Sequence, residues 1–276
     1  MPATLAGVRL VGVDEPVDIT IDGGVIAAIA PAPADRPDVS DGPALTVVPG
    51  FVDMHVHGGG GASFDALDPD EIRAAAAYHH RHGTTTMHAS LVTAPAERLR
   101  RSCALLGGLV EDGVVAGIHL EGPFLSARRC GAQDPRHIIP PDVGLLEQLW
   151  QDAAGHLAMV TIACEQEGAL DVIRWCVDHG VLAAIGHTDA DAETTARAIV
   201  ATHLFNAMPA LHHRAPGAVG ALLADPRVTC ELIFDGDHIA PTVASIAVAA
   251  AGPDRVAAVT DAISASGLPD GRHTLG

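Results

Sequence analysis

Strand-like and helix-like segments alternate from Pro49 to the end of the chain. Eight candidate strands, short and rich in aliphatic or β-branched residues, lie at 50–56, 83–92, 114–121, 156–165, 181–188, 201–207, 228–236 and 255–262. Between them, segments long enough for crossover helices include 70–82, 96–110, 142–153, 169–180, 192–200 and 241–252. This order predicts an α/β fold, a closed (β/α)8 barrel of the TIM type over residues 49–276. A doubly wound open sheet is the alternative, although no G-x-G-x-x-G motif follows the first of these strands.

The first 48 residues have a different pattern. Strand-like segments lie at 8–12, 17–30 and 44–48, and Asp22-Gly23-Gly24 is typical of a tight hairpin turn within the second. The segment 30–43 is rich in Pro and Asp, which indicates a loop. Residues 1–48 are therefore expected to form a small β appendage to the barrel.

Composition narrows the classes of function. Hydrophobic residues make up 48% of the chain and charged residues 18%, which argues against disorder. The N-terminus has no signal-peptide pattern, and no apolar run approaches the ~20 residues that span a bilayer. A net charge of −18 disfavours nucleic acid and anionic membranes as partners. A cytoplasmic protein acting on a small molecule is expected.

Two residue types limit the chemistry further. The five cysteines are scattered and form no C-x-x-C motif, which argues against a disulfide framework and a thiolate zinc site. The chain contains no lysine, so all 16 basic residues are arginine. Schiff-base chemistry and a carboxylated lysine that bridges two metals are therefore excluded.

Histidines and carboxylates recur where the predicted strands end. His55 and His57 lie two residues apart, so in a strand both rings point to the same face. Other predicted strands end in Glu121, His187, His238 and Asp261, and the sixth strand starts with His203. Because active sites of TIM barrels lie at the C-terminal ends of the strands, these residues predict a nitrogen and oxygen site for a divalent metal. His119 lies two residues before Glu121 and is a weaker candidate for a role behind the ligands, since a core histidine bonded to a neighbour is commoner.

Six sequence segments together resemble the N-acetylglucosamine-6-phosphate deacetylases, a family of the metal-dependent amidohydrolase superfamily that includes mycobacterial members. They read PGFVDMHVHG, GIHLEGPFLS, GHTDA, THLFNAMPALHHRAPG, DGDHIAP and VTDAI. The family hydrolyses the acetamide of N-acetylglucosamine 6-phosphate to glucosamine 6-phosphate and acetate, in amino-sugar catabolism and cell-wall sugar recycling. The resemblance runs from about residue 5 to the end, and THLFNAM and HLEGPF distinguish this family from other amidohydrolases.

The resemblance implies a site of one or two metal ions, most simply zinc, with iron, cobalt and manganese as alternatives. It implies Glu121, His187 and His203 as ligands of the principal ion, and His55 and His57 as ligands of a second. Asp261 is implied as the general base that accepts a proton from water and then donates it to the departing nitrogen.

Substrate contacts are also implied. Arg214 matches a phosphate-binding arginine that reaches the neighbouring active site of a homodimer, and the planar guanidinium suits phosphate. The remaining implied contacts are made by Ala132, Gln133, Asn206, Ala207 and His238. Gln133 stands where the family usually has a histidine that polarises the acetyl carbonyl or binds the sugar, so weaker activity or a changed acyl preference is expected.

Two further departures concern the chain itself. The predicted helix 192–200 runs into the predicted strand 201–207 with no evident connection, where family members have about five more residues and such loops commonly have ~2 to 6. The chain also ends soon after the eighth strand, so we expect the last helix and the C-terminal strands of the appendage to be missing.

Two other functions compete with the deacetylase. The first is another N-acyl amino-sugar amidohydrolase, against which Arg214 and THLFNAM argue. The second is a sugar-phosphate-binding protein that has lost catalysis, which the metal-site candidates and Asp261 argue against.

Overall fold

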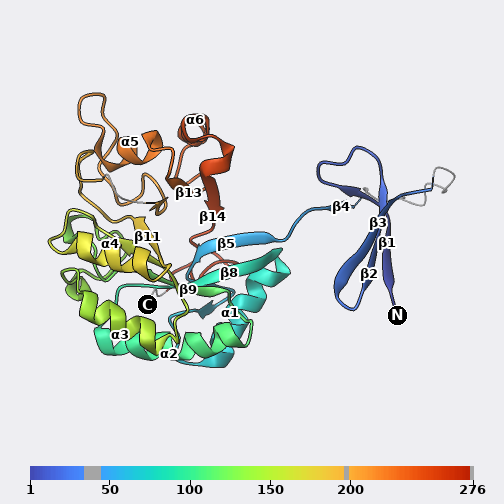
Figure 1. Ribbon diagram of the computed structural model, residues 1–276, viewed down its shortest axis with the longest axis horizontal. Helices are drawn as coiled ribbons and strands as arrows, with labels where there is room; N and C mark the ends of the chain where they lie inside the picture. Colours follow the sequence, from blue (N-terminus) through green and yellow to red (C-terminus); the bar gives the residue numbers. More distant parts are fainter. Residues whose placement is uncertain (34–44, 196–198, 274–276) are drawn as a thin grey trace. The chain divides into compact units, whose positions relative to one another are not determined.

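The structure is a computed structural model that describes residues 1–33, 45–195 and 199–273 of the chain. It divides into two compact units, Met1–Gly50 and Phe51–Gly276. Figure 1 shows the elements of each unit coloured along the sequence.

The first unit is a four-stranded sheet in the order β3-β2-β1-β4. Its strands are β1 (Ala3–Leu10), β2 (Val17–Asp22), β3 (Val25–Pro31) and β4 (Thr46–Val47). The predicted hairpin joins β2 to β3, and positive φ values of 57° and 82° at Gly23 and Gly24 suit glycine in this two-residue turn. Val8, Val17 and Ile19 form its small core. Most of the predicted loop 30–43 lies outside the described residues.

The second unit is built on a nearly closed sheet of eight parallel strands, in the order β14-β13-β12-β11-β10-β9-β8-β5. They are β5 (Phe51–Val56), β8 (Thr84–Leu91), β9 (Gly117–Glu121), β10 (Leu157–Ile162), β11 (Leu182–Ile185), β12 (Val200–Ala201), β13 (Thr229–Ile233) and β14 (Val256–Val259). A short hairpin, β6 (Gly58–Gly59) with β7 (Ala62–Ser63), follows β5. The predicted (β/α)8 architecture is confirmed.

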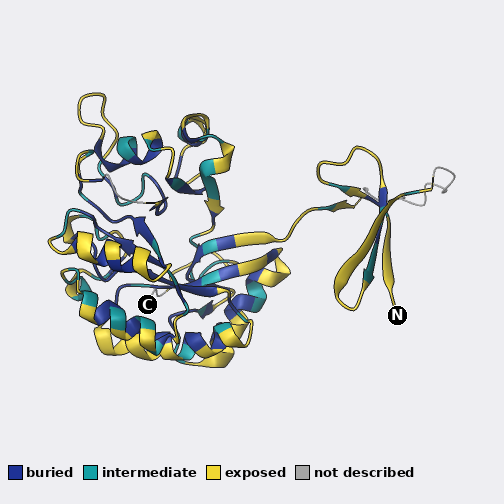
Figure 2. Cartoon of the chain, viewed as in Figure 1, coloured by how far each residue is buried: buried dark blue, intermediate teal, exposed yellow. Residues whose placement is uncertain are grey.

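Helices follow most of the strands: α1 (Pro69–Arg81), α2 (Ala96–Glu111), α3 (Val143–Asp152), α4 (Ala169–Asp178), α5 (Gly217–Ala224) and α6 (Pro241–Ala251). Alternate strand residues such as Val160 and Ile162 belong to the main core that these helices help to form, and Figure 2 shows the helices buried on one side and exposed on the other. Met159 and Ala184 belong to a separate buried cluster. The strands therefore have two buried faces, as expected for a barrel.

Hydrogen bonds between β5 and the end of β14 join the two edges of the sheet. The buried Asp53 accepts a 2.6 Å hydrogen bond from the Thr260 hydroxyl, and its other oxygen accepts from the backbone N–H of Thr260. Beyond the strand ends, the N–H of Asp261 donates to the carbonyl of His55, and that of His57 donates to Ala262. These bonds place Asp261 beside His55, in β5, and His57, which follows it.

Two sequence predictions around residue 200 were wrong. The predicted helix 192–200 is absent from the described part of that range, where residues 192–195 form turns and 196–198 lie outside the described residues. Asp191 accepts hydrogen bonds from the N–H and hydroxyl of Thr194, which is the pattern of a helix N-cap, but the described residues that follow form turns. The predicted strand 201–207 is strand only at Ala201, since His203, Phe205 and Ala207 have positive φ values.

Candidate metal centre

A cavity of about 760 Å³ opens at the C-terminal ends of the strands. Ten of the twelve residues predicted for the site line it: His57, Glu121, Ala132, Gln133, His187, His203, Asn206, Ala207, His238 and Asp261. The other two are His55, which is fully buried behind the lining, and Arg214, which is exposed. The fold thus brings together residues more than 200 positions apart in sequence.

Glu121, His187 and His203 form the first of two ligand groups, here called the Glu-His-His group. The Nε2 atoms of both histidines lie 2.9 Å from Oε1 of Glu121 and 3.1 Å from each other. All three side chains are buried. Three potential metal ligands therefore converge on one point.

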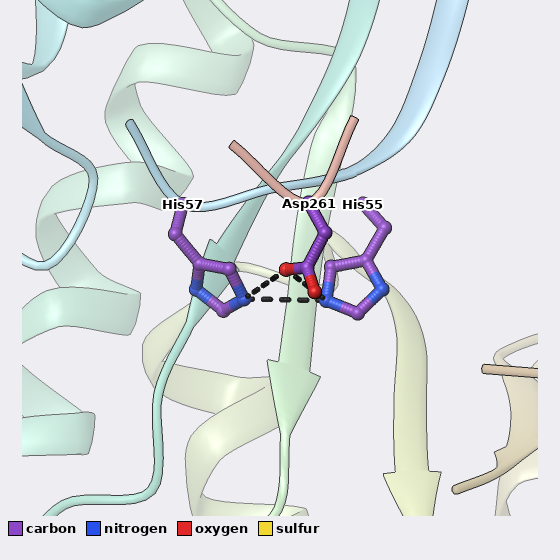
Figure 3. A group of neighbouring side chains, drawn as sticks. All are labelled: His55, His57 and Asp261. Atoms are coloured by element: carbon purple, nitrogen blue, oxygen red, sulfur yellow. Dashed lines mark hydrogen bonds and ion pairs between the residues drawn. The ribbon is translucent and has the colours of Figure 1, made fainter. Parts of the chain in front are cut away.

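His55, His57 and Asp261 form the second group, here called the His-His-Asp group (Figure 3). The two Nε2 atoms lie 3.2 Å apart, and each lies 3.4 Å from Oδ1 of Asp261. Glu121 connects the two groups, because its Oε2 lies 3.1 Å from His57 Nε2.

Unusual backbone conformations direct three of these side chains. His187, His203 and Asp261 each lie two residues beyond the last residue of a strand, and their φ values are 46°, 27° and 47°. Such values are uncommon outside glycine and cost on the order of 1 to 3 kcal/mol each. Hydrogen bonds of the neighbouring backbone hold these turns, among them Ser126 N–H to the His187 carbonyl and Asp261 N–H to the His55 carbonyl.

Partners of the ring Nδ1 atoms orient two of the histidines. Nδ1 of His187 lies 2.9 Å from the carbonyl oxygen of Arg129, which only accepts, so in the neutral ring this nitrogen carries the hydrogen and Nε2 keeps its lone pair. Nδ1 of His55 lies 3.1 Å from Oε2 of Glu231. In both rings the nitrogen that faces the other ligands is the one left free to bind a cation.

Electrostatics at the centre reflects the close packing of acids and imidazoles. Burial alone would lower the pKa of His55, but the charges of Asp261, Glu231 and Glu121 raise it well above its usual value. Burial alone would raise the pKa of Glu121, but the charges of His187 and His55 hold it well below its usual range. The centre favours a carboxylate surrounded by positive charge, whether carried by protons or by a metal ion.

Gln133 faces Glu121. Its Nε2 donates a short 2.5 Å hydrogen bond to Oε2 of Glu121, and its Oε1 accepts 2.7 Å from the backbone N–H of Thr93. Because the Thr93 N–H can only donate, the amide orientation is fixed. Both ends of this side chain are therefore engaged by the protein at the edge of the cavity.

Residues 46–273 match the amidohydrolase family. The chain belongs to this family.

Similar amidohydrolases carry deacetylase names. The N-acetylglucosamine-6-phosphate deacetylase of Bacillus subtilis (strain 168) is 38% identical over 249 residues, which cover 83% of this chain and 61% of that protein. The N-acetylgalactosamine-6-phosphate deacetylase of Escherichia coli O157:H7 is 36% identical over 268 residues, which cover 93% of this chain and 70% of that protein. The chain thus spans about three fifths to seven tenths of these relatives' length.

A solved amidohydrolase structure has the same fold. It is a mutant N-acetyl-D-glucosamine-6-phosphate deacetylase from Mycobacterium smegmatis in complex with N-acetyl-D-glucosamine-6-phosphate. It superposes with a TM-score of 0.88 at 41% identity, covering 100% of this chain and 74% of that one.

The amidohydrolase family implies a divalent metal, and the residues of this centre fit one. The two groups offer only imidazole nitrogens and carboxylate oxygens, which suit zinc and its first-row neighbours. Nδ1 of His57 and of His203 are buried and have no hydrogen-bond partner among the described residues, so these rings are held from one side only. The Nε2 atoms of His187 and His203 lie 3.1 Å apart and those of His55 and His57 3.2 Å apart, so each pair is close enough to bind one cation.

Sequence reasoning missed Glu231 and the polar layer behind the ligands. His119, a weak candidate, binds Ser90 through Nδ1 at 2.9 Å and Thr161 through Nε2 at 2.8 Å. Burial lowers its pKa well below the usual value, so it is a neutral ring that packs edge-on against His55. Glu231 lies inside an otherwise apolar strand, and a lone carboxylate between Cys230 and Leu232 was the one available signal.

Proposed function

We propose that this amidohydrolase hydrolyses the acetamide of N-acetyl-D-glucosamine 6-phosphate to D-glucosamine 6-phosphate and acetate. The observation that carries the proposal is the convergence of the Glu-His-His group with Asp261 in one cavity. The names of the relatives and the sugar phosphate bound to the mycobacterial protein support the substrate.

Glu121, His187 and His203 would hold the principal ion, and His55 and His57 a second; zinc is proposed first, with iron, cobalt and manganese as alternatives. When bound, a divalent ion lowers the pKa of water and polarises the acetyl carbonyl. Imidazole and carboxylate ligands leave that positive charge partly uncompensated, which suits a site that must act on a neutral amide.

Asp261 is proposed as the acid and base of the reaction. Its side chain is 21% exposed and lines the cavity, so it can reach both water and substrate. It would accept a proton as water attacks the acetyl carbon and donate that proton to the sugar nitrogen as the C–N bond breaks. Hydrogen bonds of its backbone to β5 keep the carboxylate beside the histidines.

Substrate contacts remain proposals. Ala132, Asn206, Ala207 and His238 line the same cavity and would contact the sugar. Gln133 is close to the reacting centre, but its amide already binds Glu121 and Thr93, so polarising the carbonyl would require new contacts. Arg214 would bind phosphate in the cavity of a second subunit, which makes a homodimer the active form.

We also propose the cytoplasm as the location of the reaction. All five cysteines are unpaired, which fits a compartment where thiols stay reduced. Among the described residues, no helix has the length and apolar character needed to cross a membrane.

The 4-epimer, N-acetylgalactosamine 6-phosphate, is a second candidate substrate because the similar protein of E. coli O157:H7 is named for it. The two sugars differ only in the direction of the C4 hydroxyl, so the acetamide chemistry is the same. Comparing kcat/KM for the two phosphorylated sugars decides between them.

Acetate release tests the proposed function. The metal-loaded chain should release acetate from N-acetylglucosamine 6-phosphate, should lose this activity with a chelator, and should regain it when a divalent ion is restored. Activity that persists after complete metal removal would contradict the mechanism. Metal binding without acetate release from any N-acetyl amino sugar would favour a binding protein.

A further inference from the structure

Glu231 is a fully buried carboxylate inside the barrel. It lies in the middle of β13, and its neighbours Cys230 and Leu232 belong to the main core. Because successive side chains of a strand point to opposite faces, Glu231 faces the interior, toward the ligand groups. Burying a carboxylate is costly unless it is well paired, so its position requires an explanation.

One oxygen of Glu231 contacts both ligand groups. Oε2 lies 3.1 Å from Nδ1 of His55 and accepts a 3.1 Å hydrogen bond from the backbone N–H of His203. The first contact places the hydrogen of His55 on Nδ1, which leaves Nε2 facing His57 and Asp261. The second contact holds the backbone of His203, whose φ of 27° needs support.

The other oxygen argues against a purely structural role. Oε1 of Glu231 is buried and has no hydrogen-bond partner among the described residues. An unsatisfied buried acceptor lowers stability. If this position served stability alone, a residue without such an acceptor would make the protein more stable.

We infer that Glu231 is a positioning residue that holds one ligand of each group, His55 and His203, in the orientation that binds metal. A carboxylate behind a metal-binding histidine fixes the tautomer and orientation of the ring, and loss of such a partner typically weakens metal binding about 10- to 100-fold. Because one oxygen serves both groups, changing it weakens both metal positions together.

Metal titration of the Glu231→Gln variant tests this inference. Glutamine keeps the size of the side chain and one oxygen for the two donors, but it is neutral, so both contacts lose the charge that strengthens them and that makes His55 a better ligand. Titration of the metal-free full chain with Co²⁺, followed by visible absorption and by elemental analysis, should show affinity reduced about 10- to 100-fold at every position that the original chain fills. Unchanged affinity and stoichiometry would overturn the inference.

Glu147→Gln is the matched control. Glu147 on α3 also accepts two hydrogen bonds, from Trp175 Nε1 at 2.9 Å and Gln151 Nε2 at 2.8 Å, but it lies outside the barrel interior. Its variant should bind Co²⁺ as the original chain does.

Melting temperatures measured without metal separate a positioning role from a structural one. If the role of Glu231 were purely structural, its replacement would lower the melting temperature and leave the Co²⁺ affinity unchanged. If Glu231→Gln does not fold, Glu231→Asp, which keeps the charge and withdraws it from His55, carries the same expectation.

The inference rests on the metal centre of the proposed function but not on the substrate. A chain that binds Co²⁺ through these groups and deacetylates no sugar would contradict the proposed reaction and leave the role of Glu231 standing.

Discussion

At the scale of single residues, replacing Asp261 should impair turnover without removing the metal. Asp261→Asn keeps the shape of the side chain but removes its ability to accept a proton. We expect the variant to retain metal and to bind the phosphorylated sugar, while kcat falls about 10²- to 10⁴-fold, the usual range for general acid and base catalysis. Steady-state kinetics with metal analysis checks this, and a near-normal kcat would remove Asp261 from the proposed role.

Cysteine reactivity gives a second test at this scale. Burial raises the pKa of Cys103 and of Cys176 to about 12 and that of Cys164 to about 11, so these thiols stay protonated and unreactive at pH 8. Cys130 is partly exposed, on the loop that leads to the cavity-lining Gly131 and Ala132. A thiol reagent should modify Cys130 first, and the sugar phosphate should slow the reaction.

Cys130→Ser is the control for that labelling. The fast labelling that we expect at Cys130 should disappear in this variant, and the slow labelling of the buried thiols should remain. A fast phase that persists would show that another cysteine is exposed in solution.

At the scale of elements, the seam between β5 and β14 depends on Asp53. Asp53→Ala removes the acceptor of the Thr260 hydroxyl and N–H, and it also removes the acceptor of the buried N–H of His55. We expect the free energy of unfolding to fall by about 2 to 4 kcal/mol, measured by chemical denaturation. Asp171→Ala is the control, because the exposed pair of Asp171 with Arg174 on α4 should contribute less than about 0.5 kcal/mol. Equal effects of the two changes would contradict this account of the seam.

The elements also show what the sequence could predict. Seven of the eight barrel strands and five of the helices were predicted, because strand and helix patterns alternate clearly and Pro or Gly separates many of them; the segment predicted for β12 shares only Ala201 with it. Helix α5 was missed because its sequence, GAVGALLA, is apolar on every side and has no helical period. The positive φ values at His203, Phe205 and Ala207 depend on tertiary contacts that no periodicity records.

At the site, the sequence predicted the ligand candidates but not the residues that hold them. Its ligand candidates could be named because they lie at strand ends and in motifs that resemble a known family. Glu231 could not, because its significance depends on His55 and His203, which lie 176 and 28 positions away in sequence. Likewise, only the structure shows that Gln133 binds Glu121.

At the scale of the whole molecule, the proposed dimer has a direct consequence. Arg214 is exposed, and the described residues that line the cavity do not include it. Arg214→Ala should therefore raise KM for the phosphorylated sugar and leave the unphosphorylated sugar nearly unaffected. An equal effect on both sugars would show that Arg214 does not contact phosphate.

Mixed dimers test whether Arg214 acts across subunits. If Arg214 serves the partner's cavity, a mixed dimer of Arg214→Ala and Asp261→Asn chains contains one site with both residues intact. Mixing the two impaired variants should then restore up to about a quarter of the original activity, assuming random exchange into twofold dimers. No recovery, with dimer exchange verified independently, would place Arg214 at the cavity of its own chain or outside the site.

The proposed reaction depends on a divalent ion held by Glu121, His187 and His203. An anomalous-difference map from crystals grown with zinc tests it most directly. We expect a peak about 2.0 to 2.2 Å from the Glu121 carboxylate and from Nε2 of both histidines. A chain that releases acetate while its map shows no peak between these three side chains would contradict it.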